Sequence, residues 1–337
     1  MSIKVLATIG PSSLNKDTIQ ELASKKVNLF RINLSHTKLD DVSNIIDDIN
    51  SWTDVPICID SEGAQVRNQD MKNESVEFKK GSTVKVHHKP IVGDNSNISL
   101  YPENVSKQLM VGDIIKIDFK ALALKVIEKR DDCLLAHVEV PGSVGSNKAA
   151  DVDRDINLAA VTDKDRNAFR IGLEKGVKNF SLSFTNTAED VKEIRDIIGD
   201  GSNLISKIES IKGVLNLKGI LPLVDQILID RGDLSREVDI DKIPFIQRRI
   251  ISYANSKRVP VFVATNLLES MVKISSPTRA EVNDIASTLL MGASGLVLAA
   301  ETAIGKHPVK AVEMVNLLIK QYERWNPDLT FEDIIFN

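Results

Sequence analysis

Cysteine and long apolar runs are both scarce in this sequence. Only Cys58 and Cys133 are cysteines among 337 residues, so a disulfide framework is not expected. Cys58 lies inside the apolar run PICID, which predicts a buried thiol rather than a metal ligand or a nucleophile. No apolar run approaches the roughly 20 residues that cross a bilayer, and the amino-terminal MSIKVLATIGP has no signal-peptide core. These absences predict a cytoplasmic protein without a membrane partner.

An excess of either charge is also missing. The chain has 43 Lys and Arg against 47 Asp and Glu, which gives a net charge of -4 and a pI near 5.8. This weakly negative balance argues against a nucleic-acid partner, although it leaves room for a local basic pocket that binds phosphate. With 42% hydrophobic and 27% charged residues, the chain can bury a large core and is long enough for a barrel with an inserted domain.

Short β-branched runs alternate with helical patterns along most of the chain. Helices are expected over Thr187 to Ile198, Ile243 to Asn255 and Ala280 to Met291. The eight strand-like runs are, in order, KVLAT, NLFRIN, PICID, NFSLSF, LISKIE, ILIDRGD, PVFVAT and GLVLAAE. Eight strand-helix units are the number that closes a (β/α)₈ TIM barrel, which places the chain in the α/β class. The serine that ends the first turn, Ile9 to Ser13, is expected to cap the first helix.

The stretch from residue 69 to 154 has a different pattern. It contains SVEFKKG, TVKVHH, DIIKID, LALKVIE and LLAHVEV, which alternate apolar and polar residues and are separated by Gly and Asn or Asp turns. This pattern predicts a small antiparallel β-barrel lid domain inserted into the TIM barrel, which would comprise residues 1–68 and 155–337. A static decorative domain fits the same pattern as well as a lid that closes over a site.

Two of the strand-like runs end in several charged residues. LISKIE ends in Lys207 and Glu209, and ILIDRGD carries Asp230, Arg231 and Asp233 at its end. Since the carboxyl ends of barrel strands share one rim, Lys207, Glu209 and Asp233 are expected to lie together. Two carboxylates near a lysine suit a hard divalent cation that bridges protein and phosphate oxygens. The alternative is a set of solvated loop residues. Other strand ends add Thr8, Arg31, Asn33, Asp60, Ser183, Thr265 and Glu301 to the same rim.

The order of the motifs resembles the pyruvate kinase family over nearly the full length of the chain. The motifs are ATIGPSS, RINLSH, IDSEGAQVR, SLSF, ISKIES, DRGDLSREV, ATNLLESMVKISSPTRAE and AAETAIGKHP. KIE followed by RGDL and then by LESM and PTRAE is a long and specific signature. The resemblance implies a TIM barrel with an inserted β lid, and phosphoryl transfer from phosphoenolpyruvate to ADP with Mg²⁺ or Mn²⁺, giving pyruvate and ATP. It also implies that the family's C-terminal regulatory domain is absent here, and it allows a homo-oligomer.

The resemblance also implies roles for individual residues. Glu209 and Asp233 match the metal ligands of the family, and Lys207 matches the lysine that faces the transferring phosphoryl group. Thr265 matches the threonine near the methylene carbon of the enolate and, with Lys207 and Arg31, forms the catalytic set. The residues that match the family's substrate-binding set are Arg231, Gly232, Arg67 and Ser183. Those that match its monovalent-cation site, which binds K⁺, are Asn33, Ser35, Asp60 and Ser61. Those that match its nucleotide site are His36 and Lys148.

The sequence departs from the family pattern in two places. Beside the expected K⁺ site, Glu62 stands where the family has a lysine and Gln65 where it has the glutamate linked to K⁺ dependence, so K⁺ use stays open. The other departures lie on the nucleotide side: the family's aspartate-aspartate-glycine turn reads Asp118, Phe119, Lys120, and the remaining changes are Thr37, Ala299, Ala300 and Ile304. They remove an acidic group, a hydroxyl and a cation, whereas the metal and enolpyruvate positions remain.

Three functions therefore stay open. The first is a pyruvate kinase-like phosphotransferase. The second is a metal-dependent enzyme of the same barrel that acts on a pyruvate or enolpyruvate unit by carbon-carbon cleavage, decarboxylation or transfer to another acceptor. The third is a regulatory or structural pseudoenzyme, which the retained metal pair disfavours. ADP-dependent release of pyruvate would distinguish the first from the other two.

Overall fold

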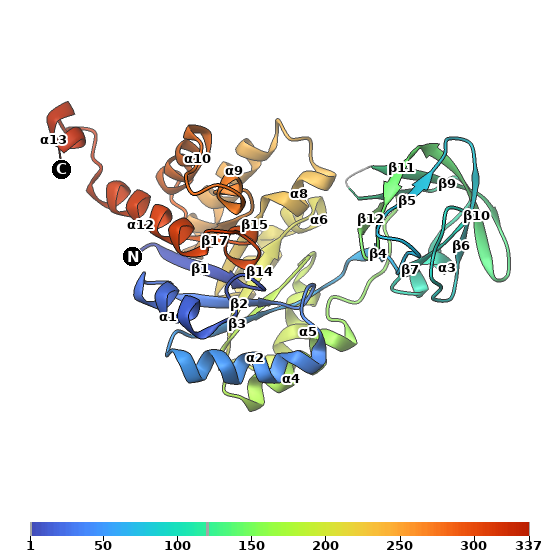
Figure 1. The fold of residues 1–337 in the computed structure, drawn as a ribbon, viewed down its shortest axis with the longest axis horizontal. Helices are drawn as coiled ribbons and strands as arrows, with labels where there is room; N and C mark the ends of the chain where they lie inside the picture. The colour runs from blue at the N-terminus through green and yellow to red at the C-terminus, as the bar shows by residue number, and fades with distance from the viewer. Residues whose placement is uncertain (1, 119–120, 337) are drawn as a thin grey trace. The chain divides into compact units, whose positions relative to one another are not determined.

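Eight parallel strands close into the TIM barrel that the sequence predicts. The computed structural model describes residues 2–118 and 121–336, and Figure 1 traces the chain through them. The barrel strands are β1 (Lys4–Ile9), β2 (Leu29–Asn33), β3 (Ile57–Asp60), β13 (Asn179–Leu182), β14 (Asn203–Ile208), β15 (Gln226–Asp230), β16 (Val261–Ala264) and β17 (Gly295–Leu298). They run around the barrel in the order β1, β17, β16, β15, β14, β13, β3, β2, and every adjacent pair is parallel. The predicted eight strand-helix units are confirmed.

Burial on both faces explains why these apolar runs form the barrel. Strands such as β1 and β15 are buried almost throughout, because one face packs inside the barrel and the other under the helices. The interior layer is Leu6, Leu29, Cys58, Ile205, Leu228, Phe262, Ala264 and Val297. Gly295 makes room for the Phe262 ring in this layer, since a Cβ on the glycine would lie 2.4 Å from Phe262 Cδ1.

Helices surround the strands on the outside of the barrel (Figure 1). They are α1 (Lys16–Ser24), α2 (Leu39–Trp52), α4 (Asp163–Glu174), α5 (Ala188–Ile198), α6 (Ile211–Leu215), α7 (Leu217–Ile220), η1 (Leu221–Leu223), α8 (Arg231–Glu237), α9 (Ile243–Ser256), η2 (Glu269–Val272), α10 (Arg279–Leu290), α11 (Ala300–Ala303) and α12 (Pro308–Arg324), followed by α13 (Phe331–Phe336). Across residues 2–118 and 121–336, no helix has the length and apolar character that a membrane span requires.

The first helix begins differently from the prediction. Asn15 caps α1, because its side chain accepts a hydrogen bond from Thr18 N at 3.0 Å. Ser13 lies before the helix, where its hydroxyl accepts a hydrogen bond from Gly10 N at 3.2 Å. The prediction of a serine cap was wrong, since the tight turn at Gly10 uses this hydroxyl and the chain continues for two more residues before the helix starts.

The second unit, residues 64–159, contains a smaller β-barrel with a core of its own. Its elements are β4 (Val66–Asn68), β5 (Val76–Phe78), β6 (Thr83–His87), β7 (Asn97–Tyr101), α3 (Asn104–Gln108), β8 (Ile114–Ile117), β9 (Leu122–Lys129), β10 (Cys133–Val140), β11 (Gly142–Val144) and β12 (Ala149–Val152). The barrel order is β10, β6, β7, β4, β12, β8, β9, and its pairs are antiparallel except β6 with β7. Because β4 pairs with β7 and β12, the predicted limits of 69 and 154 are too narrow for this unit.

Cys58 is a buried thiol, as the sequence predicts. Its side chain is 1% exposed, and burial, followed by the negative charge of Asp60, raises the pKa of the Cys58 thiol to about 12. At pH 8 only about one molecule in 10⁴ would carry the reactive thiolate. We expect native protein to resist alkylation of Cys58 by iodoacetamide in a mass-spectrometric assay, with urea-unfolded protein as the control. Equal rates for the two samples would contradict this expectation.

Candidate active site

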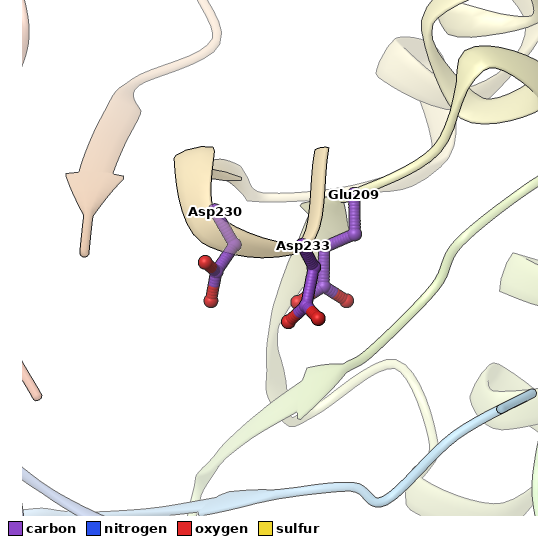
Figure 2. Close-up of side chains that lie close together, drawn as sticks. All are labelled: Glu209, Asp230 and Asp233. Atoms are coloured by element: carbon purple, nitrogen blue, oxygen red, sulfur yellow. The ribbon is translucent and has the colours of Figure 1, made fainter. Parts of the chain in front are cut away.

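Three carboxylates meet at the carboxyl ends of β14 and β15. Glu209 directly follows β14, Asp230 ends β15, and Asp233 lies in the first turn of α8. One oxygen of each lies within 4.8 Å of the others, and Figure 2 shows the three carboxylates pointing to the same side. The parallel pairing of the two strands brings their ends side by side. The sequence predicted Glu209 and Asp233 as ligands but missed Asp230, whose only signal was its place at the end of an apolar run.

Lys207 lies among these carboxylates. Its Nζ is 2.8 Å from Glu209 Oε1 and donates to the Ser183 hydroxyl at 3.1 Å. It also lies 3.5 Å from Asp60 Oδ2 and 3.7 Å from Asp230 Oδ2. Burial opposes the charge on Lys207, but Asp60 and Glu209 outweigh it and raise the pKa of the ammonium above its ordinary value. Lys207 is therefore a fixed positive charge inside a buried site.

Arg31 and Asp60 form a buried pair beside Lys207. Arg31 Nε donates to Asp60 Oδ2 at 2.8 Å, and Arg31 Nη1 donates to the Thr8 hydroxyl at 3.1 Å. The Ser181 hydroxyl donates to Asp60 Oδ1 at 2.5 Å. Burial works against ionisation of Asp60, but Arg31 and Lys207 prevail and hold the pKa of this carboxyl below its ordinary value. The rim thus carries two cations that are oriented by an ionised aspartate.

Thr265 follows β16 and turns its hydroxyl toward the carboxylates. Its Oγ1 donates to Asp230 Oδ1 at 2.5 Å. Gly232 permits the close approach, because a Cβ at this position would lie 2.7 Å from Thr265 Cγ2. The three residues predicted to be catalytic, Lys207, Arg31 and Thr265, are thus linked through Asp60 and Asp230.

Comparison with known proteins decides the family. The family model described as "Pyruvate kinase, barrel domain" matches residues 1–312 of this chain. The chain belongs to the pyruvate kinase family. It is 34% identical to the pyruvate kinase of Thermotoga maritima over 332 residues, which cover 96% of this chain and 71% of that protein.

Two other pyruvate kinases match the chain with similar sequence identity. The protein of Thermococcus litoralis is 32% identical, with 97% of this chain and 71% of the relative covered. The protein of Bacillus licheniformis is 30% identical, with 95% of this chain and 57% of the relative covered. The chain therefore spans 57% to 71% of the length of these pyruvate kinases.

Membership in the pyruvate kinase family implies a divalent metal, and the chemistry of the cluster fits one. Mg²⁺ and Mn²⁺ prefer oxygen ligands, and Glu209, Asp230 and Asp233 converge with carboxylate oxygens. Burial raises the pKa of Glu209 and of Asp233, so their negative charges are costly unless a cation compensates them. A divalent cation would supply that compensation.

The residues that the pyruvate kinase resemblance assigns to K⁺ lie at the ends of β2 and β3. Asn33 and Asp60 are register partners, so parallel pairing places them side by side. Asn33 Oδ1 accepts a hydrogen bond from Ser35 N at 3.0 Å. The Ser61 carbonyl accepts one from the Ser183 hydroxyl at 2.7 Å. These contacts bring the four residues of the set together with Ser183 at one part of the rim.

A lysine lies close to this set. Lys164 Nζ donates to Leu34 O at 2.5 Å and is 4.0 Å from Glu62 Oε2. Leu34 is flanked by two residues of the K⁺ set, so a protein cation already stands at this part of the rim. Glu62, the charge-reversing departure, therefore faces a positive partner.

A cavity of about 650 Å³ opens beside Arg31. It is lined at the carboxyl ends of β1, β2 and β17 by residues that include Thr37, Ala299, Ala300 and Ile304 from the nucleotide-side departures, together with His36 and Lys38. Arg31 borders the cavity and also contacts Asp60, which neighbours Lys207. A molecule in the cavity would therefore lie beside Arg31, which is one member of the charged centre.

Two further predicted residues lie in the second unit. Arg67 Nη1 donates to a backbone carbonyl at 2.9 Å. Lys148 Nζ is 3.8 Å from Asp118 Oδ2. The neighbouring departures Phe119 and Lys120 lie outside the described residues.

Proposed function

We propose that this chain catalyses phosphoryl transfer from phosphoenolpyruvate to ADP with Mg²⁺, giving pyruvate and ATP. The observation that carries the proposal is the buried Lys207 ammonium, which lies 2.8 to 3.7 Å from oxygens of Asp60, Glu209 and Asp230. Phosphoryl transfer needs positioning and charge neutralisation rather than covalent chemistry from the protein. A fixed cation beside a set of metal ligands supplies both.

The charged residues divide the work of the proposed transfer. Lys207 and Arg31 provide positive charge beside the phosphoryl oxygens while the phosphoryl group is transferred from the enolate oxygen to ADP. Glu209 and Asp233, with Asp230, would hold the divalent cation, which would neutralise charge on the phosphoryl group and on the enolate. Because Lys207 is buried, its charge acts in a medium that screens it less than water does.

The substrate-binding residues hold the enolpyruvate in this proposal. Backbone groups at Arg231 and Gly232 bind the carboxylate, and Ser183 orients Lys207 through its hydroxyl. Thr265 is assigned to the protonation of the enolate methylene carbon, and Asp230 orients its hydroxyl.

We also propose that a second cation, K⁺, is bound by Asn33, Ser35, Asp60 and Ser61. The glutamate that the family pattern links to K⁺ dependence is Gln65 in this chain, so one negative charge that would favour K⁺ is absent. Dependence on K⁺ is therefore expected to be weaker than dependence on Mg²⁺.

The cavity beside Arg31 is proposed as the nucleotide site, with His36 at its wall. Ile304 is 60% exposed and lines this cavity where the family pattern has a lysine. We expect Ile304→Lys to lower the KM for ADP about two- to fivefold, because an exposed cation near phosphate contributes up to about 1 kcal/mol. Steady-state kinetics measure the effect, and Ile304→Met controls for side-chain length. An unchanged KM in both variants would show that ADP phosphates lie elsewhere.

Pyruvate release tests the function directly. Purified protein with Mg²⁺ and phosphoenolpyruvate should form pyruvate and ATP in equal amounts when ADP is added, and chelation of the metal should stop the reaction. Pyruvate formation that ignores ADP would indicate another phosphoryl acceptor or water. Failure to form pyruvate at saturating ADP and Mg²⁺ would reject the proposal.

A further inference from the structure

The backbone of Thr265 is unusual for a β-branched residue. Its φ is 76°, in the left-handed region, and the following residue, Asn266, has φ 56°. A β-branched side chain rarely adopts this conformation, because its Cβ substituents clash with the backbone there. Contacts from the surrounding structure must therefore hold Thr265 in place.

The guanidinium of Arg231 supplies the contacts to the backbone. Its Nη2 donates to Thr265 O at 2.6 Å, and its Nε is 3.2 Å from Thr265 O and 3.3 Å from Ala264 O. Both carbonyls lie at the carboxyl end of β16, so one rigid planar group holds the end of this strand. Hydrogen bonds from a charged donor are stronger than those between neutral groups.

Asp284 holds Arg231 from the other side. Its Oδ2 lies 2.6 Å from Arg231 Nη1, and it belongs to α10, which starts at Arg279. The Arg231 side chain is 13% exposed and that of Asp284 is 36% exposed, so the guanidinium is buried while water reaches the aspartate. The Thr265 hydroxyl donates to Asp230, and this contact requires the backbone of Thr265 to keep its present conformation.

We propose that Asp284, acting through Arg231, is a positioning residue that keeps Thr265 in its left-handed conformation. Its catalytic consequence rests on the proposed function, in which Thr265 meets the methylene carbon of the enolate. When Asp284 loses its charge, Arg231 keeps its donors to Ala264 O and Thr265 O but loses the charged partner that orients the guanidinium, so its hold on the Thr265 carbonyl weakens. The strained backbone then relaxes, and the hydroxyl moves away from the position set by Asp230.

The test compares Asp284→Asn with a matched ion pair elsewhere in the barrel. Asp225 Oδ2 lies 2.6 Å from Arg195 Nη2, so Asp225→Asn removes the same kind of contact away from Thr265. We expect Asp284→Asn to lower kcat for pyruvate formation about 10- to 100-fold, since a small misplacement of a reacting group has this effect. The KM for phosphoenolpyruvate and the Kd for Mn²⁺ should change less than about threefold. Asp284→Glu should restore much of kcat, and Asp225→Asn should leave it unchanged.

Two further measurements separate this proposal from the proposed function. The first measurement is the rate at which the methyl protons of pyruvate exchange with D₂O, followed by NMR in the absence of nucleotide. This rate reports protonation of the enolate, and it should fall in Asp284→Asn by about the same factor as kcat. The ¹³C-methyl resonance of Thr265 reports the local conformation without any turnover, and it should shift in Asp284→Asn but not in Asp225→Asn. If native protein makes no pyruvate, the proposed function fails while the resonance still tests the positioning. An unmoved Thr265 resonance, or equal losses of kcat in both variants, would overturn the role of Asp284.

Discussion

Lys207→Met is expected to reduce ADP-dependent pyruvate formation at least about 10²- to 10³-fold, the usual effect of removing one preorganised charge from a transition state. The affinity for Mn²⁺ should be equal or higher, because the ammonium that lies 2.8 Å from Glu209 Oε1 no longer competes with the metal. Coupled kinetics and Mn²⁺ titration followed by electron paramagnetic resonance measure the two quantities. This combination would assign Lys207 to the phosphoryl group rather than to metal binding.

Loss of Lys207 also leaves buried carboxylates without their partner, which can cost about 3 to 5 kcal/mol of stability. Circular dichroism must therefore show that the variant is folded, and Lys207→Arg keeps the charge if Lys207→Met does not fold. Lys242→Met is the control, since Lys242 forms an exposed pair with Asp239 at 2.6 Å. A folded Lys207→Met variant with more than a tenth of native activity would contradict the proposed mechanism.

Glu209→Gln should weaken Mn²⁺ binding at least about 100-fold, because it removes an anionic oxygen ligand from a three-carboxylate cluster. Asp230→Asn should weaken it about tenfold, which would establish the ligand that the sequence did not reveal. Isothermal titration calorimetry gives both dissociation constants. Glu313→Gln, which removes a carboxylate from an exposed pair with Lys25, serves as the control.

Protein stability gives an independent check on Glu209→Gln. Burial raises the pKa of Glu209 above its unfolded value, so the folded protein binds the proton more tightly and ionisation of this carboxyl costs stability. A neutral amide avoids this cost, and the metal-free variant should unfold at a temperature similar to or above that of the native protein. Weak metal binding together with a large fall in Tm would instead indicate a misfolded site.

The barrel and much of its rim follow from local patterns in the sequence. Each strand is a short apolar run, and a parallel barrel gathers all carboxyl strand ends on one rim. Lys207, Glu209, Asp233, Arg31 and Thr265 were therefore found from their places at the ends of such runs, and the family motifs added the roles expected of Arg31 and Thr265. The structure places all five on this rim, with Asp60 and Asp230 between them.

Other features depended on contacts between distant residues. Asn15 caps α1 because the turn at Gly10 uses Ser13, and β4 belongs to the second unit because it pairs with β12 about 80 residues later. Asp230 ends an apolar run like many structural aspartates, and only its distances to Glu209 and Asp233 place it in the cluster.

Sequence patterns thus determined the number of strand-helix units and the rim on which the charged residues lie, since both depend on neighbours along the chain. Only the tertiary structure decided that Asp284 reaches Thr265 through Arg231. That link needs the register of β15 beside β16 and the placement of α10, which are set by packing between segments far apart in sequence. Local periodicity carries no information about such partners, because the same residues are compatible with many packings until the barrel closes.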